Sequence, residues 1–162
     1  MPPPPLSVSA ARGADLDGPY RYRLWRRWDD ADTLLFVMLN PSTADHQRDD
    51  PTLRRCMGFA RRWGFGGVEV VNLFAWRATR PRALREAPDP VGPRNDQVIA
   101  EAAACCAAVI AAWGAHGALR DRAAVVRAAL RAASPRCLGL TAAGQPRHPL
   151  YVPADAQPMP LP

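Results

Sequence analysis

The stretch 34-LLFVMLNPSTADH-46 decides the fold, because an unbroken apolar run stops there at a polar loop. The run 34–39 is short, which predicts a β-strand buried on both faces of a sheet. Pro41 cannot donate a hydrogen bond to a sheet ladder, so the strand should end at Asn40. Open α/β sheets bind ligands where buried strands end in polar loops. The loop is therefore either one part of a binding site or only a turn.

Length and composition predict one globular domain. The chain has 162 residues, of which 48% are hydrophobic, enough to build a single core. No apolar run approaches the roughly 18 residues of a transmembrane helix, and the Pro-rich start lacks the regions of a signal peptide. We expect a cytoplasmic monomer with no membrane partner. We predict a disordered or extended Pro-rich tail over 1–19, a single α/β domain over 20–154 and a Pro-rich tail over 155–162.

The chain is basic, with a net charge of +6, and all 21 of its basic residues are Arg. Guanidinium groups bind phosphates and carboxylates through two oxygens at once. Coding bias explains most of this Arg content, because Ala, Pro and Gly are abundant too. A basic surface is compatible with DNA or a nucleotide as partner but does not demonstrate one. The four cysteines have no C-x-x-C spacing and no nearby paired histidines, so we predict neither a metal site nor a cofactor.

Periodicity in the rest of the chain predicts alternating helices and strands. Residues 20–28 alternate aromatic and Arg side chains, which favours a strand with buried aromatics and exposed Arg, paired antiparallel with strand 34–40. The later elements are helix 51–63, strand 68–74, helix 94–106, strand 108–113, helix 118–133 and strand 136–140. Asp49 or Asp50 should cap the first helix, with Pro51 in its first turn. This order predicts a three-layer α/β sandwich with four mainly parallel central strands and strand 20–28 as an antiparallel edge.

Polar side chains follow the end of every predicted parallel strand, at Asn40 to His46, Asn72, His116, and Thr141 to His148. Parallel strands end at the same edge of a sheet, so these distant groups should converge on one crevice. This convergence is the strongest functional inference that the pattern alone supports.

Several of these side chains suit a reactive or binding site. Asn40 can hold a water or a carbonyl group, because its amide both donates and accepts, or it can cap the turn before Pro41. Ser42 and Thr43 can bind a phosphate together with backbone amides of the loop. Asp45 is a candidate general base that no helix cap explains.

Two further residues complete the candidate site. Asn72 can read a nucleobase edge through two directed hydrogen bonds, or it can satisfy a neighbouring backbone group. His148 titrates near neutral pH, and the prolines around it indicate a fixed position. The predicted catalytic residues are Asn40, Asp45 and His148. The predicted substrate-binding residues are Pro41, Ser42, Thr43, Asn72, Phe74, Trp76, Arg147 and Leu150.

Short motifs spread over residues 20–154 carry a family resemblance. They are YRYRLWRRW (20–28), LNPSTAD (39–45), DPT (50–52), NLF (72–74), PVGP (90–93) with ND (95–96), WG (113–114), and GLT (139–141) through RHPLY (147–151). With these motifs the chain resembles the bacterial and phage family called domain of unknown function 1643. The family name assigns no activity.

The strand ends carry a second resemblance. Asn40-Pro41 ends the first core strand, Asn72 ends a later one, and His148-Pro149-Leu150 lies near the C-terminus. This layout is similar to that of the uracil-DNA glycosylase superfamily, which extrudes a base from the stack before cleaving its glycosidic bond. The resemblance implies that Asn40 positions the attacking water, Asn72 reads the base, His148 stabilises the base anion and Leu150 wedges the duplex. The loop 42–46 and the Pro-rich connection after Trp76 depart from that superfamily's usual pattern.

Three hypotheses about function follow. The first is a glycosylase-like hydrolase that acts on the N-glycosidic bond of a nucleobase or nucleic acid. The second is a non-catalytic protein that binds nucleic acid or a nucleotide. The third is an enzyme acting on a small nucleotide or sugar phosphate, with Asp45 as its base. Fold alone does not choose among them.

Overall fold

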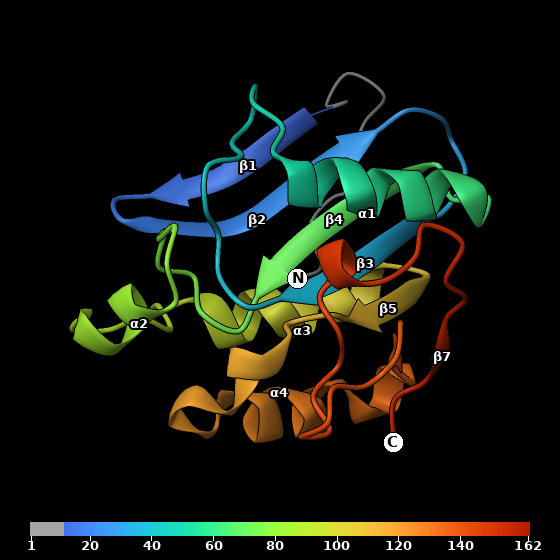
Figure 1. The fold of residues 1–162 in the computed structure, drawn as a ribbon. Helices are drawn as coiled ribbons and strands as arrows, with labels where there is room; N and C mark the ends of the chain where they lie inside the picture. Colours follow the sequence, from blue (N-terminus) through green and yellow to red (C-terminus); the bar gives the residue numbers. More distant parts are fainter. Residues whose placement is uncertain (1–11) are drawn as a thin grey trace.

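A computed structural model describes residues 12–162, which build a seven-stranded mixed β-sheet covered by helices (Figure 1). The strand order across the sheet is β1-β2-β4-β3-β5-β6-β7. The strands are β1 (Arg12–Asp17), β2 (Tyr20–Arg27), β3 (Thr33–Met38), β4 (Gly67–Asn72), β5 (Ala108–Ala111), β6 (Arg136–Cys137) and β7 (Met159–Pro160). The adjacent strands β4, β3, β5 and β6 run parallel, and β1, β2 and β7 pair antiparallel.

Four α-helices and three 3-10 helices connect the strands. They are α1 (Pro51–Arg62), α2 (Arg82–Glu86), α3 (Asn95–Cys105), η1 (Ala115–Asp121), α4 (Arg122–Leu130), η2 (Arg131–Ala133) and η3 (Pro149–Tyr151). Helix α1 starts as predicted. The Asp50 carboxylate accepts a hydrogen bond from the Leu53 amide at 2.8 Å, and Pro51 occupies the first turn.

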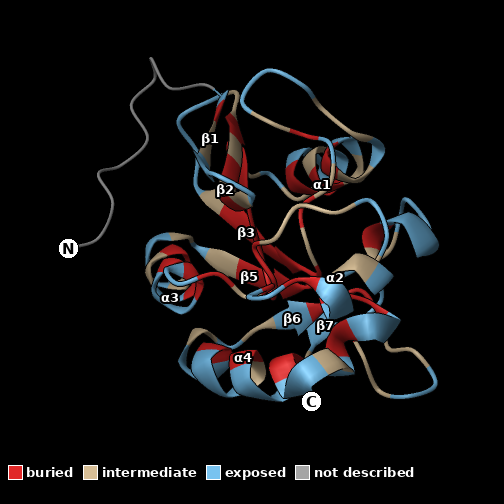
Figure 2. Ribbon diagram, turned by 90° about the vertical axis from the view of Figure 1, so that its left-hand side faces the viewer, coloured by how far each residue is buried: buried red, intermediate tan, exposed pale blue. Residues whose placement is uncertain are grey.

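Helices pack on both faces of the sheet and create two apolar cores. On one face, Leu53 and Phe59 of α1 pack with Phe36 of β3. On the other face, Ile99 of α3 packs with Val37 of β3, and α4 extends the same core. The strand β3 is buried on both sides, as its apolar run predicts, and Figure 2 shows the central strands and inner helix faces as buried.

The sheet differs from the prediction in its pairing. It is mixed rather than mainly parallel, because antiparallel strands extend the parallel strands on both sides. The predicted pairing of β2 with β3 is wrong: β2 pairs with β4, with Leu24 opposite Val70. The two strands are consecutive in sequence, but β4 lies between them in the sheet, and a local turn does not reveal such an insertion.

Residues that we assigned to the two tails belong to the sheet. Residues 12–17 of the predicted tail 1–19 form β1, an edge strand paired with β2, and residues 1–11 lie outside the described part of the chain. In the predicted tail 155–162, Met159 and Pro160 form β7 and pair with β6. Edge strands tolerate Pro and Gly because one side of the strand needs no ladder hydrogen bonds, so composition alone misleads here.

The strand order creates a topological switch point at the centre of the sheet. The chain passes from β3 to β4 on one side and then crosses to β5 on the other side of β3. In open α/β sheets, the crevice at the carboxyl ends of two such strands is the usual ligand site.

Within residues 12–162, no helix is long and apolar enough to cross a membrane.

A β-bulge interrupts β2 beside this sheet edge. Asp15 of β1 faces Arg23 and Leu16 faces Arg21, so Tyr22 has no partner across the ladder. The extra residue puts Arg21 on the α1 side of the sheet, where it donates to the Ala44 backbone, while Tyr22 packs into the core on the opposite side. Bulges often re-aim side chains near functional sites.

Candidate functional site

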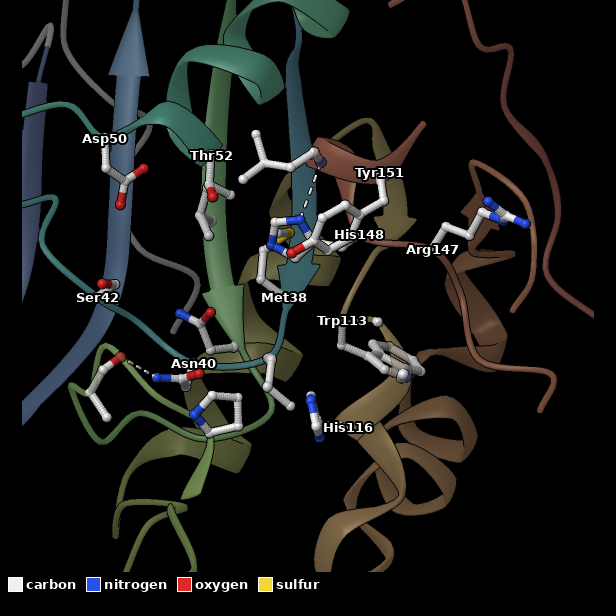
Figure 3. A pocket seen from close by; sticks show the side chains of 18 of the residues that line it. Met38, Asn40, Ser42, Asp50, Thr52, Trp113, His116, Arg147, His148 and Tyr151 are labelled. Atoms are coloured by element: carbon white, nitrogen blue, oxygen red, sulfur yellow. Dashed lines mark hydrogen bonds between the residues drawn. The ribbon is translucent and has the colours of Figure 1, made fainter. Parts of the chain in front are cut away.

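A cavity of about 720 Å³ lies at the carboxyl edge of the parallel strands. Its walls come from the ends of β3, β4 and β5, the start of α1 and the segment 141–151 (Figure 3). The predicted convergence is confirmed for Asn40, Asn72, His116, Thr141 and His148, which all line this one cavity. The volume is typical of sites for small ligands, which measure about 300–1,000 Å³.

Asn72, the last residue of β4, presents a buried amide to the cavity. The residue is 1% exposed, and neither its Oδ1 nor its Nδ2 has a hydrogen-bond partner within the described residues. Leaving a polar group buried without a partner costs about 1–3 kcal/mol. A ligand that offers one donor and one acceptor would remove this cost. Asn72 is therefore the clearest candidate for a ligand-reading group in the cavity.

The backbone that carries Asn72 is held from below by α3 and α4. Asn95 is fully buried, and its Nδ2 donates to the carbonyl oxygens of Asn72 at 2.9 Å and Leu73 at 3.1 Å. The Arg122 Nε also donates to the Leu73 oxygen, at 3.0 Å, and its Nη2 pairs with Asp96 at 2.9 Å. The helix predicted over 94–106 begins at Asn95, and the Asn95 amide fixes the end of β4.

Asn40 follows β3, and its side-chain amide is oriented by two backbone carbonyls. Its Nδ2 donates to Pro41 at 3.0 Å and to Ala78 at 2.8 Å. These bonds use both hydrogens of the amide nitrogen, which leaves Oδ1 as the polar atom available to the cavity that Asn40 lines. A fixed acceptor oxygen of this kind can orient a water molecule through one of its O–H groups.

His148 precedes η3 and lines the cavity, where Figure 3 shows it near Met38. Its Nδ1 accepts a hydrogen bond from the Leu150 amide at 3.1 Å, so the proton of the neutral ring is on Nε2. Burial lowers the pKa of His148, against a smaller opposing effect of Asp50. The ring is therefore neutral near pH 7 and offers an N–H donor.

Several contacts fix the segment before His148 against the end of β5. The Gly114 amide donates to Pro146 at 2.8 Å, the Arg147 amide donates to Gly139 at 2.9 Å, and the Trp113 Nε1 donates to Gln145 at 2.7 Å. Gly114 has a φ of +79°, and a Cβ atom there would lie 3.5 Å from the His148 Cβ. The fixed position that the prolines predict is thus provided mainly by hydrogen bonds.

The pH dependence of stability should reveal the neutral state of His148. Its pKa is lower in the folded than in the unfolded chain, so the unfolded chain binds more protons and stability falls as the pH drops below about 6.5. His148→Asn keeps an acceptor for the Leu150 amide and cannot titrate. Between about pH 7 and pH 5, the wild type should lose more unfolding free energy than this variant in urea denaturation.

The matched control for that comparison is His116→Asn, because His116 is exposed at the cavity rim. It should keep the wild-type pH profile. Parallel profiles for the wild type and His148→Asn would contradict the assignment of a buried neutral ring.

Arg21 also lines the cavity, although the alternation of β2 predicted an exposed side chain. The residue is 3% exposed, and its Nη1 donates to the Ala44 oxygen at 2.9 Å. That prediction is wrong because the bulge at Tyr22 shifts the alternation by one residue. Arg26 is buried as well, because it lies on the α1 face of the sheet, where it pairs with Asp49 at 2.9 Å.

Three predicted substrate-binding residues also line the cavity besides Asn72. Ser42 contributes from the loop after β3, and Leu150 lies on the cavity with 39% of its surface exposed. Arg147 is a lining residue as well, but Figure 3 shows its side chain directed away from the other labelled groups, and its Nε donates to Leu140 at 3.1 Å.

Asp45, Thr43 and Pro41 are not among the residues that line the cavity. The Asp45 carboxylate accepts hydrogen bonds from the Gln47 amide at 2.9 Å and the Arg48 amide at 2.8 Å, and these bonds lower its pKa. Asp45 therefore caps its own loop, and this contact explains the residue. Thr43 is exposed, and Pro41 is buried with its carbonyl bound to Asn40.

Phe74 and Trp76 also lie outside the cavity. Phe74 is fully buried in the core on the α3 side, because β4 ends at Asn72 and the alternation of faces ends with it. Trp76 is half-buried and packs edge-on against Tyr20, with ring centroids 5.8 Å apart. Both residues shape the fold near the site without reaching a ligand.

Other cavity residues are absent from the predicted catalytic and substrate-binding residues. They are chiefly Met38, Asp50, Thr52, Trp113 and Tyr151. His116 was predicted at this crevice from its place after a strand end but was given no role, and Tyr151 follows His148 within one short motif. Within residues 12–162, no three His, Cys, Asp or Glu side chains group as a metal site would require.

Comparison with known proteins identifies a family. The family model described as "Protein of unknown function (DUF1643)" matches residues 21–150, a span that includes Arg21, Asn40, Asn72, His148 and Leu150. Searches of curated proteins and of solved structures found no match. Since the matched span covers most of the 162 residues, the chain belongs to this family of proteins of unknown function, DUF1643.

Proposed function

We propose that the protein hydrolyses the N-glycosidic bond of a nucleobase bound in the cavity, in a nucleotide or in nucleic acid. The observation that carries the proposal is the buried amide of Asn72, a cavity-lining residue, whose two polar atoms have no hydrogen-bond partner within residues 12–162. An amide of this kind pairs with the donor and acceptor pattern on the edge of a base.

The neighbouring groups suit the two halves of such a reaction. Water adds to C1′ of the sugar, the C1′–N bond breaks, and its electron pair leaves with the base. The Asn40 Oδ1 would orient the water, which finally releases a proton. The His148 Nε2–H would donate a hydrogen bond to the base as negative charge develops on it, and the base takes up a proton on release.

The resemblance to the uracil-DNA glycosylase superfamily supports the same roles. Asn40-Pro41, Asn72 and His148-Pro149-Leu150 correspond to that superfamily's strand-end and C-terminal motifs, and the residues Asn40, Asn72, His148 and Leu150 share one cavity. Leu150, partly exposed on the cavity, would be the residue that enters the base stack. By contrast, Asp45 faces its own loop amides, which removes the main support for an enzyme with Asp45 as base.

A second candidate is a non-catalytic binder of nucleotides or nucleic acid. The specific observation in its favour is that the two most deeply buried polar groups on the cavity, Arg21 and Asn72, are binding groups rather than proton-transfer groups. Such a protein would retain full ligand affinity without the Asn40 side chain and would leave every glycosidic bond intact.

The decisive experiment is a chromatographic assay for released base. The panel comprises nucleosides, nucleotides, and single- and double-stranded oligonucleotides that carry normal, deaminated or alkylated bases. We expect release of at least one base by the wild type, and none by Asn72→Ala. Thr43→Ala is the matched control, because Thr43 is exposed in the same region and is not a cavity residue. If no member of the panel is cleaved but some bind, the second candidate replaces the first.

A further inference from the structure

We propose that the cavity selects an anionic ligand, and that Arg21 binds a phosphate or carboxylate group attached to the nucleobase compound. The nucleobase part rests on the proposed function, and the negative charge is the new element. The substrate class would then be nucleotides, or nucleosides whose base bears a carboxylate, rather than neutral nucleosides.

The first argument is that Arg21 is a buried cation without an ion-pair partner. Its one hydrogen bond from the guanidinium within the described residues goes to a neutral carbonyl, that of Ala44. None of the carboxylates in residues 12–162 comes within 4.0 Å of it, and residues 1–11 contain no Asp or Glu. The Nε atom is buried and has no acceptor in the described part of the chain.

The other two buried Arg residues provide the contrast. Arg26 is 2% exposed and pairs with Asp49 at 2.9 Å, and Arg122 is 5% exposed and pairs with Asp96 at 2.9 Å. Neither of them lines the cavity. Buried charges in proteins are normally paired, because desolvation of an isolated ion is costly. The one buried guanidinium that lacks a carboxylate is thus the one that lines the cavity.

The second argument is energetic. Burial lowers the pKa of Arg21 to about 10, despite the opposing influence of Asp50, so the group stays charged near pH 7 at a cost to stability. A bound anion would offset that cost, and the planar guanidinium can hold two oxygens of a phosphate or carboxylate at once.

The third argument is that the fold turns Arg21 towards this edge. The bulge at Tyr22 brings Arg21 to the side of the sheet where Asn72, Ser42 and Thr52 line the same cavity. An anion at Arg21 and a base edge at Asn72 can therefore belong to one ligand. Asp50 is the carboxylate on this cavity, and one of its oxygens is held by the Leu53 amide as the helix cap.

Isothermal titration with charge-matched pairs tests the proposal. The pairs are each nucleoside against its 5′- and 3′-monophosphate, and uracil against orotate, which separates a phosphate from a carboxylate source. We expect one anionic member to bind the wild type about tenfold or more tightly than its neutral partner. Arg21→Gln should abolish that preference, and Arg80→Gln should keep it, because Arg80 is exposed and is not a cavity residue.

Two further variants keep the test decisive. If Arg21→Gln does not fold by circular dichroism, Arg21→Lys replaces it; loss of the two-oxygen geometry should weaken the anionic ligand several-fold and leave the neutral one unchanged. Asp50→Asn keeps the helix cap and should strengthen anion binding by removing a like charge. If Asp50 were simply the counterion of Arg21, this variant would lose stability and leave ligand preference unchanged.

Equal affinity for charged and neutral partners, or a preference that survives in Arg21→Gln, would overturn the anion proposal. The same samples are analysed for released base, so the two proposals fail separately. Anion preference without base release refutes hydrolysis alone. Base release from neutral and charged compounds alike refutes the role of Arg21 alone.

Discussion

Asn40→Ala should reduce base release by roughly 10²-fold or more, because the attacking water loses its fixed acceptor. The Asn40 amide is oriented by the carbonyls of Pro41 and Ala78, so its Oδ1 has little freedom to move. Substrate affinity should change little, since the proposed ligand contacts of Asn72 and Arg21 do not involve the water. His148→Ala should lower kcat about 10²–10³-fold, because the departing base would lose its hydrogen-bond donor.

Single-turnover rates and titration calorimetry measure the two quantities separately. Thr43→Ala provides the baseline, because this exposed residue is not part of the cavity lining. Wild-type rates in Asn40→Ala would exclude the water-orienting role. A loss of affinity as large as the loss of rate would instead make Asn40 a ligand-binding residue and exclude the water-orienting role.

Asn95→Ala should lower the free energy of unfolding by about 1–3 kcal/mol, because it removes two buried hydrogen bonds at once. The Asn95 Nδ2 donates to the carbonyls of Asn72 and Leu73, and the residue is fully buried. The Asn72 carbonyl loses this donor, whereas the Leu73 carbonyl keeps Arg122 as a second donor. Ligand affinity should fall as well, since the support under the Asn72 side chain is weakened.

Urea denaturation and calorimetry of the same variant check both effects. Gln97→Ala is the control on the same helix, because Gln97 is exposed and bonds only to Glu101 one turn further on. It should cost less than about 0.5 kcal/mol. A stable Asn95→Ala protein with unchanged ligand affinity would show that α3 does not position Asn72.

The location of the polar strand ends could be predicted from the sequence, because parallel strands all end at the same edge of a sheet. The apolar run 34–39 marks a strand buried on both faces, and helix–strand alternation then brings Asn40, Asn72 and His148 to the same sheet edge. This inference needs no side-chain detail, which is why it succeeds for residues far apart in sequence. Parallel topology identifies the edge of the sheet where a ligand can bind, but it does not identify which polar atoms remain free to contact that ligand.

The remaining features depend on contacts that periodicity does not contain. The side of the sheet that Arg21 occupies is set by one extra residue, Tyr22, and a bulge of this kind leaves no clear mark in an alternating sequence. Asp45 resembled a base because its capping role involves amides only two and three residues away in a loop. Phe74 follows Asn72 at an even spacing, yet the strand has ended and the two residues belong to opposite sides.

The two sides of the cavity come from segments near opposite ends of the sequence. One side contains Arg21 of β2, and the other contains η3 and the residue before it, His148. Contacts between such distant segments carry a high loop-closure cost, so we expect them to form late in folding. The sheet and its two apolar cores can therefore assemble before the cavity is complete. We therefore expect ligand affinity to arise in the last step of folding. On heating, a chain cleaved between β6 and η3 should lose ligand affinity at a much lower temperature than its secondary structure.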